Sequence, residues 1–276
     1  MSNSDQIEYW NGKAGERWRD DAEALDALLE PYLKAVLAAL TSELSGHILD
    51  VGCGGGSLSF AAHARHSDIK VTGVDVSKPL LSLAGERADG SSALDFIEAD
   101  ASSFSSETTF DALISRFGVM FFTDPVAAFS NLRAQMVPGA PMSFACWRAA
   151  SENDWIMTPL KAAHSFLQDE LSMPPARAPG PFAFAEADYV THILDSAGWN
   201  SVWVEPWDGT LTMPGETLSD TAEFSLTIGP LARLIAEQDI DRDKLKKAVV
   251  GLLEEQMGSN GKVELGAAAW IVTAKA

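Results

Sequence analysis

Three aspartates near the ends of apolar segments are the residues whose type and spacing point most clearly to chemistry. Asp50 precedes a run in which residues 52, 54, 55 and 56 are all glycine. Asp75 lies 23 residues after Gly52, and Asp100 follows a third apolar segment. A carboxylate beside a glycine turn attracts a cation, and one at the next strand end can accept hydrogen bonds from both hydroxyls of a ribose. The pattern predicts a site for a nucleoside-containing cofactor.

The glycine run and Asp50 together favour a cationic cofactor over a pyrophosphate. Glycines directly after a buried strand let the backbone turn sharply and approach a ligand. Dinucleotide sites prefer the pattern G-x-G-x-x-G, whereas Ser57 stands at the third glycine position here. They also bind a pyrophosphate at a helix N-terminus, near which Asp50 would be unfavourable. A cofactor with an ammonium and a sulfonium group would instead be attracted by Asp50.

Asp75 suits NAD and S-adenosylmethionine equally well. Asp100 helps to decide between these two cofactors. Asp100 and Ala101 end a predicted strand at a position where an adenine can be recognised through its exocyclic amine. Val76 and Ala101 would supply apolar surfaces for the ring. The three acids together favour S-adenosylmethionine.

Short apolar strands alternate with helices through the first half of the chain. This alternation predicts an α/β fold with a mostly parallel, doubly wound sheet, in which strand ends meet at one edge. Asp50, Asp75, Asp100 and Ser115 are therefore expected to converge. The predicted strands are 48–51, 70–74, 94–98, 110–115, 141–147, 199–205 and an antiparallel last strand at 263–274.

Segments outside this alternation are predicted to be helical additions to a single domain, 1–276. Apolar residues recur at helical spacing from Ala22 to Leu40, although Pro31 is expected to kink or restart that helix. Residues 1–40 therefore form a predicted N-terminal helical cap. Segments 148–185 and 206–258 are predicted lid insertions that form the pocket for a second substrate.

Composition narrows the possible partners. The net charge of −19 and the scattered basic residues argue against nucleic-acid binding. Cys53 and Cys146 are the two cysteines, so neither a disulfide framework nor a metal site is expected, and a reducing cytoplasm fits best. The sequence also suggests no signal peptide and no membrane span, because no 18 apolar residues run together.

The ordered motifs resemble those of class I S-adenosylmethionine-dependent methyltransferases, which have a Rossmann-like fold. The resemblance rests on Asp50-x-Gly52-x-Gly54-x-Gly56, Asp75, the pair Asp100-Ala101 and the strand Phe110-Asp111-x-Leu-Ile-Ser. Flanking segments at 10–18, 116–122 and 132–147 are similar to the small-molecule branch related to ubiquinone and menaquinone biosynthesis methyltransferases. Motif detail covers residues 8–147, and the last two strands match in topology only.

The resemblance implies roles for individual residues. Gly52 and Gly54 would line the amino-acid end of S-adenosylmethionine, Asp75 would bind its ribose, and Asp100 with Ala101 its adenine. Ser115 and Arg116 lie where the family brings backbone groups near the methionine portion. Trp10 and Trp18 belong to an N-terminal aromatic segment that often closes over the cofactor.

The predicted function is methyl transfer to a small, partly apolar molecule by in-line displacement. Orientation of the nucleophile suffices unless the acceptor must lose a proton, in which case His164 is the candidate base, although a histidine there is more often a surface residue. The alternatives are an NAD-dependent oxidoreductase and a non-catalytic S-adenosylmethionine-binding or interaction protein. The acceptor atom (oxygen, nitrogen, carbon or sulfur) and the oligomeric state are left open.

Overall fold

The computed structural model describes residues 3–40, 44–65, 68–166, 175–238 and 240–276. Contacts along the chain divide it into two compact units. The first consists of Met1–Trp147, Arg177–Pro206 and Ala269–Ala276, and the second of Arg148–Ala176 and Trp207–Ala268. Predicted insertion residues 167–174 lie outside the described residues. The assignment of the whole chain to one domain stays a prediction.

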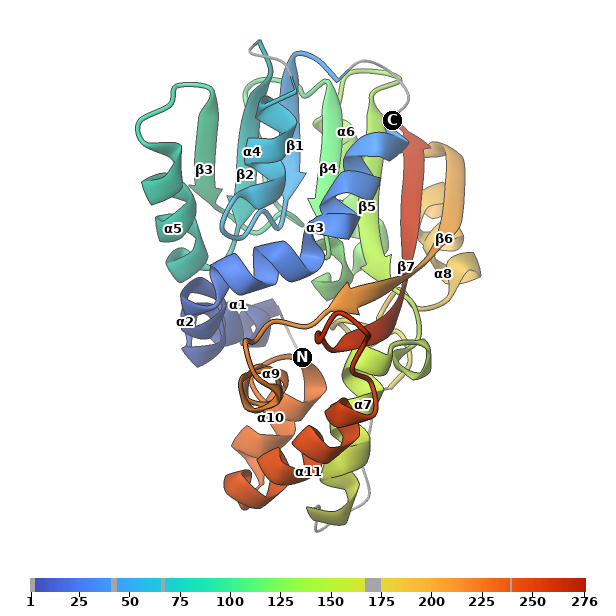
Figure 1. Cartoon of the computed structure of the whole chain (residues 1–276). Helices are drawn as coiled ribbons and strands as arrows, with labels where there is room; N and C mark the ends of the chain where they lie inside the picture. The colour runs from blue at the N-terminus through green and yellow to red at the C-terminus, as the bar shows by residue number, and fades with distance from the viewer. Residues whose placement is uncertain (1–2, 41–43, 66–67, 167–174, 239) are drawn as a thin grey trace. The chain divides into compact units, whose positions relative to one another are not determined.

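A seven-stranded sheet with the order β3-β2-β1-β4-β5-β7-β6 organises the fold (Figure 1). The pairs β3–β2, β2–β1, β1–β4 and β4–β5 are parallel, and β5–β7 is antiparallel. The predicted fold class is thus confirmed. The strands are β1 (His47–Val51), β2 (Lys70–Asp75), β3 (Leu94–Glu98), β4 (Ala112–Arg116), β5 (Pro141–Trp147), β6 (Asn200–Thr212) and β7 (Glu264–Lys275).

The strand order reverses at β1, whose neighbours are β2 on one side and β4 on the other. In open parallel sheets, this switch point opens a crevice at the carboxyl ends of the strands. The central strands are apolar on both faces, with Leu49, Leu113 and Ile114 fully buried, because helices cover the sheet on both sides. The predicted cofactor site therefore lies at the position that the topology favours.

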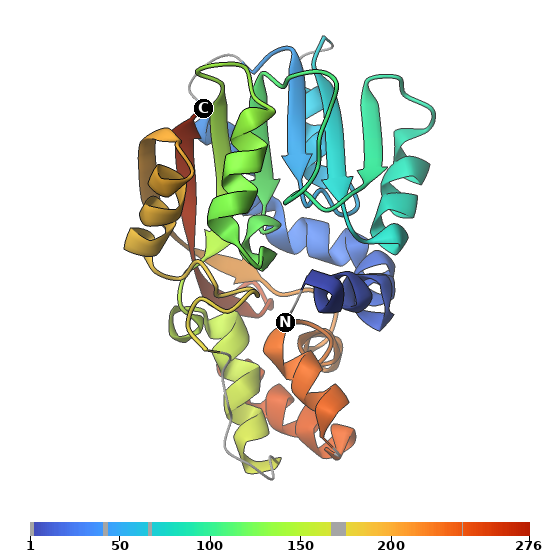
Figure 2. The same cartoon turned by 180° about the vertical axis from the view of Figure 1, so that it is seen from behind.

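Helices of the first unit cover the two faces of the sheet. Figure 1 shows α3 (Ala22–Ala39) and α4 (Ser57–His63) in front of the strands, and Figure 2, from behind, shows α6 (Pro125–Ala134) and α8 (Ala187–Ser196). Helix α5 (Lys78–Ala88) packs against β3. This two-sided cover is the doubly wound arrangement expected from the sequence.

The N-terminal cap consists of α1 (Asn3–Asn11), α2 (Lys13–Asp20) and α3. Helices α1 and α2 lie beyond the edge to which the arrowheads of β1 to β4 point (Figure 1). Helix α3 contains Pro31 without restarting there. Its apolar side, which includes Leu28, Tyr32 and Val36, is buried, and the helix packs against β4 and β5. This burial offsets the hydrogen bond lost at proline.

The second unit is helical. It contains α7 (Asp154–Ala163), α9 (Leu218–Ser225), α10 (Gly229–Glu237) and α11 (Arg242–Glu254), with short 3₁₀ helices η2 (Ala150–Glu152) and η3 (His164–Phe166). Helix α11 packs against α7 and α9. Asn153, fully buried, exchanges hydrogen bonds with both backbone groups of Ala268 and thereby connects the two segments of this unit.

Strand β6 continues to Thr212, beyond the predicted end at residue 205. The predicted second insertion at 206 therefore begins inside a strand. Pro206 lies inside β6, which is the last strand in the sheet order, and an edge strand tolerates a residue that has no N–H to donate. Within the described ranges, no helix is both long and apolar enough to cross a membrane.

Candidate cofactor site

The loop between β1 and α4 is held open by its glycines. Gly52, Gly54 and Gly56 have φ values of 67°, 53° and 82°, a region that favours glycine. A Cβ on Gly52 would lie 2.6 Å from the Cα of Gly118. The two chain segments can therefore approach this closely only because residue 52 has no side chain. At Gly54 the nearest described heavy atom to such a Cβ would be a Leu80 methyl carbon at 3.8 Å. Gly54 therefore leaves an unobstructed backbone surface.

Asp50 lies buried beneath this loop. Its Oδ2 accepts a hydrogen bond of 2.6 Å from Ser59 Oγ, and its Oδ1 has no hydrogen-bond partner among the described residues. Burial raises the pKa of Asp50 to about 7, an effect opposed by the Ser59 hydrogen bond and by the charge of Arg116. A buried acceptor without a donor is costly, so this oxygen is suited to a ligand that donates a hydrogen bond.

Asp75 is half-buried at the end of β2 and is fixed by two backbone amides. Its Oδ2 accepts from Gly54 N at 2.8 Å, and its Oδ1 accepts from Ser77 N at 2.8 Å. Burial raises the pKa of Asp75, whereas these hydrogen bonds lower it. Each carboxylate oxygen can accept more than one hydrogen bond, so both keep capacity for a ribose hydroxyl.

Asp100, Ala101 and Val76 follow the ends of β3 and β2 at the same edge. Asp100 Oδ1 accepts from Ser102 N at 2.9 Å, which fixes the turn. Ala101 is buried, and its carbonyl accepts a hydrogen bond of 3.3 Å from Asn131 on α6. The predicted adenine residues therefore belong to an ordered loop next to the strand that carries Asp75.

Ser115 joins the ends of β1 and β4. Its Oγ donates to Val51 O at 2.7 Å and accepts from Gly118 N at 3.3 Å. Ser115 is fully buried, so its side chain maintains the backbone of the crevice. The structure thus brings Asp50, Asp75 and Ser115 together around the glycine loop.

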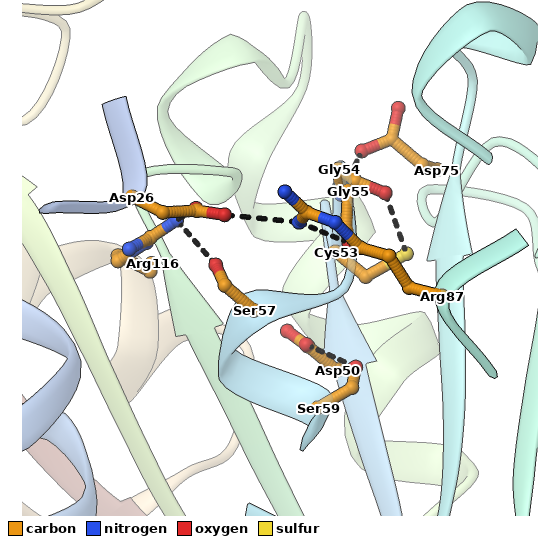
Figure 3. A network of polar contacts seen from close by, with 10 residues as sticks. All are labelled: Asp26, Asp50, Cys53, Gly54, Gly55, Ser57, Ser59, Asp75, Arg87 and Arg116. Atoms are coloured by element: carbon orange, nitrogen blue, oxygen red, sulfur yellow. Dashed lines mark hydrogen bonds and ion pairs between the residues drawn. The ribbon is translucent and has the colours of Figure 1, made fainter. Parts of the chain in front are cut away.

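Arg116 belongs to an ion-pair network around the same loop (Figure 3). Its Nη2 contacts Asp26 Oδ1 at 3.0 Å and donates to Ser57 Oγ at 2.7 Å. Asp26 Oδ2 contacts Arg87 Nη1 at 2.9 Å, and this same nitrogen donates to Gly55 O at 2.9 Å. Asp26 therefore lies between two arginines and connects α3 to both sides of the loop.

Helix α3 is fixed near Asp26 by an aromatic cluster of Tyr32, Phe117 and Trp147. The rings of Phe117 and Trp147 stack with centroids 4.1 Å apart, and Tyr32 packs edge-on against both. Phe117 follows Arg116 and has a φ of 62°, which turns the chain at the end of β4. Burial raises the pKa of Tyr32. The cluster consists of core residues that support the network.

The N-terminal cap is bound directly to the loop that follows Asp75. Asn11 Nδ2 donates to Val76 O at 2.7 Å, and Asn11 Oδ1 accepts from Lys78 N at 3.0 Å. Trp10 O accepts from Ser77 Oγ at 2.9 Å, while the Trp10 ring packs edge-on against Trp18 with centroids 5.5 Å apart. Trp10 and Trp18 are half-buried in this cap.

His164 is exposed and lies in the second unit. With Met157, Leu160 and Lys161 it lines a hollow of about 280 Å³. The glycine loop belongs to the first unit, so a role for His164 as a base stays a prediction, as does the acceptor pocket assigned to 148–185 and 206–258.

Four residues around the loop were not identified from the sequence: Asn11, Asp26, Ser59 and Arg87. Ser59 had a local signal, because a serine near the start of the helix after a glycine loop lies close to the strand that precedes the loop. No local signal in the sequence indicates Asp26 or Arg87, since the two residues are 61 positions apart and meet only through the fold.

One region of the chain matches a known protein family. Residues 48–139, which include the glycine loop, Asp75, Asp100 and Arg116, match a family described as "Methyltransferase domain".

Several curated relatives match part of the chain. Phosphoethanolamine N-methyltransferase 1 of Triticum aestivum is 38% identical over 33% of this chain and 19% of its own length. Ubiquinone biosynthesis O-methyltransferase of Coxiella burnetii is 34% identical over 36% of this chain and 42% of its own length. The chain spans about half or less of the curated relatives it matches.

A solved structure shares the fold. Phosphoethanolamine N-methyltransferase 2 of Haemonchus contortus, in complex with S-adenosyl-L-methionine, has a TM-score of 0.53 and 17% identity over 88% of this chain and 52% of that one. At this level of identity the similarity concerns the fold alone. The matched methyltransferase region and the curated relatives confirm the resemblance to methyltransferases seen in the sequence.

Proposed function

We propose, from the match of residues 48–139 to a methyltransferase domain, that the protein transfers a methyl group from S-adenosylmethionine to a small, partly apolar molecule. The observation that carries the proposal is the buried Asp50 carboxylate, whose Oδ1 lacks a donor within the described structure, beside the open backbone of Gly54. An acid at this position suits an ammonium group and disfavours a pyrophosphate.

The residues around the loop fit this cofactor part by part. Asp50 would bind the ammonium group, Gly52 and Gly54 would line the amino-acid end, and Asp75 would accept the ribose hydroxyls. Asp100, Val76 and Ala101 would hold the adenine, and Trp10 and Trp18 would cover the bound molecule. Ser115 and the Arg116 backbone would lie near the methionine portion.

The bound cofactor supplies a methyl group on a sulfonium, which leaves as a neutral thioether in an in-line displacement. The contribution of the chain is then binding and orientation, because a correctly placed nucleophile needs little further assistance. The cap would also exclude water from the site. A proton acceptor is needed only for an acceptor that must be deprotonated, and His164 is the candidate for that case.

The acceptor is proposed to be a small molecule. The two relatives are named for an N-methyl and an O-methyl transfer, so they do not agree on an acceptor atom. The net charge of −19 supports an acceptor other than nucleic acid. A cytoplasmic location is proposed because Cys53 and Cys146 are both free and buried.

Calorimetric titration with S-adenosylmethionine and S-adenosylhomocysteine tests the proposal, and both are expected to bind. Transfer of labelled methyl from S-adenosylmethionine to a panel of small phenols, amines and thiols then identifies the acceptor. If neither compound binds, the proposal fails. Binding without transfer to any acceptor would favour the non-catalytic alternative, and a nicotinamide fluorescence titration would reveal an NAD-binding protein.

A further inference from the structure

We propose that the side chain of Arg116, held in place by Asp26, binds the α-carboxylate at the amino-acid end of the methyl donor. This inference rests on the proposed function and deepens it. It assigns Arg116 a side-chain contact and gives Asp26, a residue of the N-terminal cap, a positioning role.

The first argument is an unused donor. Arg116 Nη1 is buried and has no hydrogen-bond partner in the described part of the chain, and its side chain is only 13% exposed. Its Nη2 contacts both Asp26 and Ser57. Because the guanidinium is planar, these two contacts fix the direction of Nη1. A carboxylate is the acceptor that a guanidinium binds best.

The second argument is charge. Asp26 is shared by Arg116 and Arg87, so two positive charges face one negative charge. Arg87 donates in addition to Gly55 O, a neutral acceptor. The carboxylate of Asp26 is therefore divided between two guanidinium groups and compensates Arg116 only in part.

The third argument is the pairing of opposite charges. Asp50 and Arg116 are on adjacent strands β1 and β4, and each has one buried polar atom without a partner within the described ranges. Figure 3 shows both side chains close to the same loop. An α-amino acid end carries an ammonium and a carboxylate on one carbon atom. Asp50 and Arg116 offer the complementary pair.

Asp26 is suited to hold Arg116 because α3 is itself fixed. Tyr32, on the same helix, is fully buried and packs against Phe117, the residue after Arg116. The helix that supplies Asp26 and the strand end that supplies Arg116 are thus joined twice, once by the ion pair and once by aromatic packing.

The test compares two ligands that differ only in the carboxylate, S-adenosylmethionine and its decarboxylated form. Calorimetry on the full chain is expected to show a preference of the natural protein for S-adenosylmethionine of roughly tenfold or more, the range of a charge-assisted hydrogen bond. Arg116→Met should remove this preference, so that the affinity for S-adenosylmethionine falls at least about tenfold more than the affinity for the decarboxylated ligand. Asp26 retains its ion pair with Arg87 in this variant.

Two variants control for indirect effects. Asp26→Ala should reduce the preference less than Arg116→Met does, since the guanidinium is then oriented by Ser57 alone. Arg87→Met removes the other ion pair of Asp26 and should leave the preference intact. If Arg116→Met does not fold, Arg116→Lys, which keeps the charge but loses the planar fork, should show a reduced preference.

The outcomes separate this inference from the proposed function. If the natural protein binds neither ligand, the proposed function fails. If it binds both and Arg116→Met keeps the preference, or loses affinity for both ligands equally, the carboxylate role of Arg116 is overturned and the proposed function stands. An Asp26→Ala variant with the full preference of the natural protein would overturn the positioning role, and loss of the preference in Arg87→Met would move the contact to Arg87.

Discussion

Ser59 Oγ donates a 2.6 Å hydrogen bond to Asp50 Oδ2 in the core beneath the glycine loop. This contact satisfies one oxygen of a buried carboxylate and leaves the other without a donor in the described structure. Burial raises the pKa of Asp50 to about 7, so the charge of this residue changes near neutrality. A buried acid with one carboxylate oxygen unpaired among the described residues is suited to bind a cation.

The pKa of Asp50 predicts that the natural protein loses stability relative to Asp50→Asn as pH rises. The folded protein holds a proton up to about pH 7, whereas an unperturbed aspartate releases it near 3.8. This contribution to folding is therefore present at low pH and lost as pH rises through 7. The difference between the two proteins in the free energy of unfolding should shift in favour of Asp50→Asn by up to about 4 kcal/mol between pH 4 and 8.

Urea denaturation of both proteins at several pH values measures this difference. Comparing the two proteins cancels the titration of the other acids. A difference that is constant from pH 4 to 8 would show that Asp50 is ionised throughout this range.

Gly52 and Gly54 should respond differently to alanine. At Gly52 the added Cβ meets the Gly118 backbone at 2.6 Å, so Gly52→Ala should destabilise the fold strongly. At Gly54 only the positive φ is unfavourable, which costs about 1–2 kcal/mol. Gly54→Ala should therefore fold and bind S-adenosylhomocysteine weakly, because its methyl group occupies the surface that the cofactor approaches.

Thermal denaturation and calorimetric titration of the two variants provide the measurements. If Gly54→Ala binds S-adenosylhomocysteine with the affinity of the natural protein, the cofactor does not bind beside Gly54. Equal melting temperatures for Gly52→Ala and the natural protein would mean that the loop can move away from Gly118.

Asn11→Ala should loosen the N-terminal cap. The substitution removes the hydrogen bonds to Val76 O and from Lys78 N, which connect α1 to the loop after Asp75. Amide hydrogen exchange in residues 3–20 should become faster, and the dissociation constant for S-adenosylhomocysteine should rise several-fold.

Glu8→Ala, a change at an exposed position of the same helix, is the matched control and should have neither effect. If Asn11→Ala speeds exchange but leaves the affinity unchanged, the cap does not cover the cofactor.

Asp75→Ala should lose most of the affinity for S-adenosylhomocysteine while the protein still folds. The carboxylate is the proposed acceptor for the ribose hydroxyls, and it also receives Gly54 N and Ser77 N. Loss of a charge-assisted pair predicts a decrease in affinity of at least about tenfold.

Calorimetry gives the affinity of this variant, and circular dichroism confirms its fold. The affinity of Asp75→Asn, which keeps one acceptor oxygen, should lie between that of the natural protein and that of Asp75→Ala. Unchanged binding in Asp75→Ala would assign the ribose to another residue.

The sheet and the glycine loop were predictable because their signals are local. A buried strand such as β1 is a short apolar run, and the parallel arrangement of β1 to β5 follows from their alternation with helices. Asp50 and Asp75 could be identified because each stands at a strand end in the sequence itself.

Contacts between distant segments could not be predicted. Asp26 meets Arg116 across 90 residues, and both residue types are common on exposed helices and loops. The continuation of β6 through Pro206 also had no local signal, since only the position of β6 at the sheet edge makes a proline acceptable there.

The position of β7 between β5 and β6 has a consequence for the order of folding. Strand β6 is made before β7, yet it can join the sheet only after β7 has paired with β5. Until residues 264–275 are in place, the edge of β5 presents unpaired backbone groups, which in other proteins is a site of aggregation. Pairing of β5 and β7 is a contact of long sequence separation, from Trp147–Ala269 to Pro141–Lys275, and such contacts slow folding. A chain shortened before β7 would therefore lose both terminal strands of this side of the sheet.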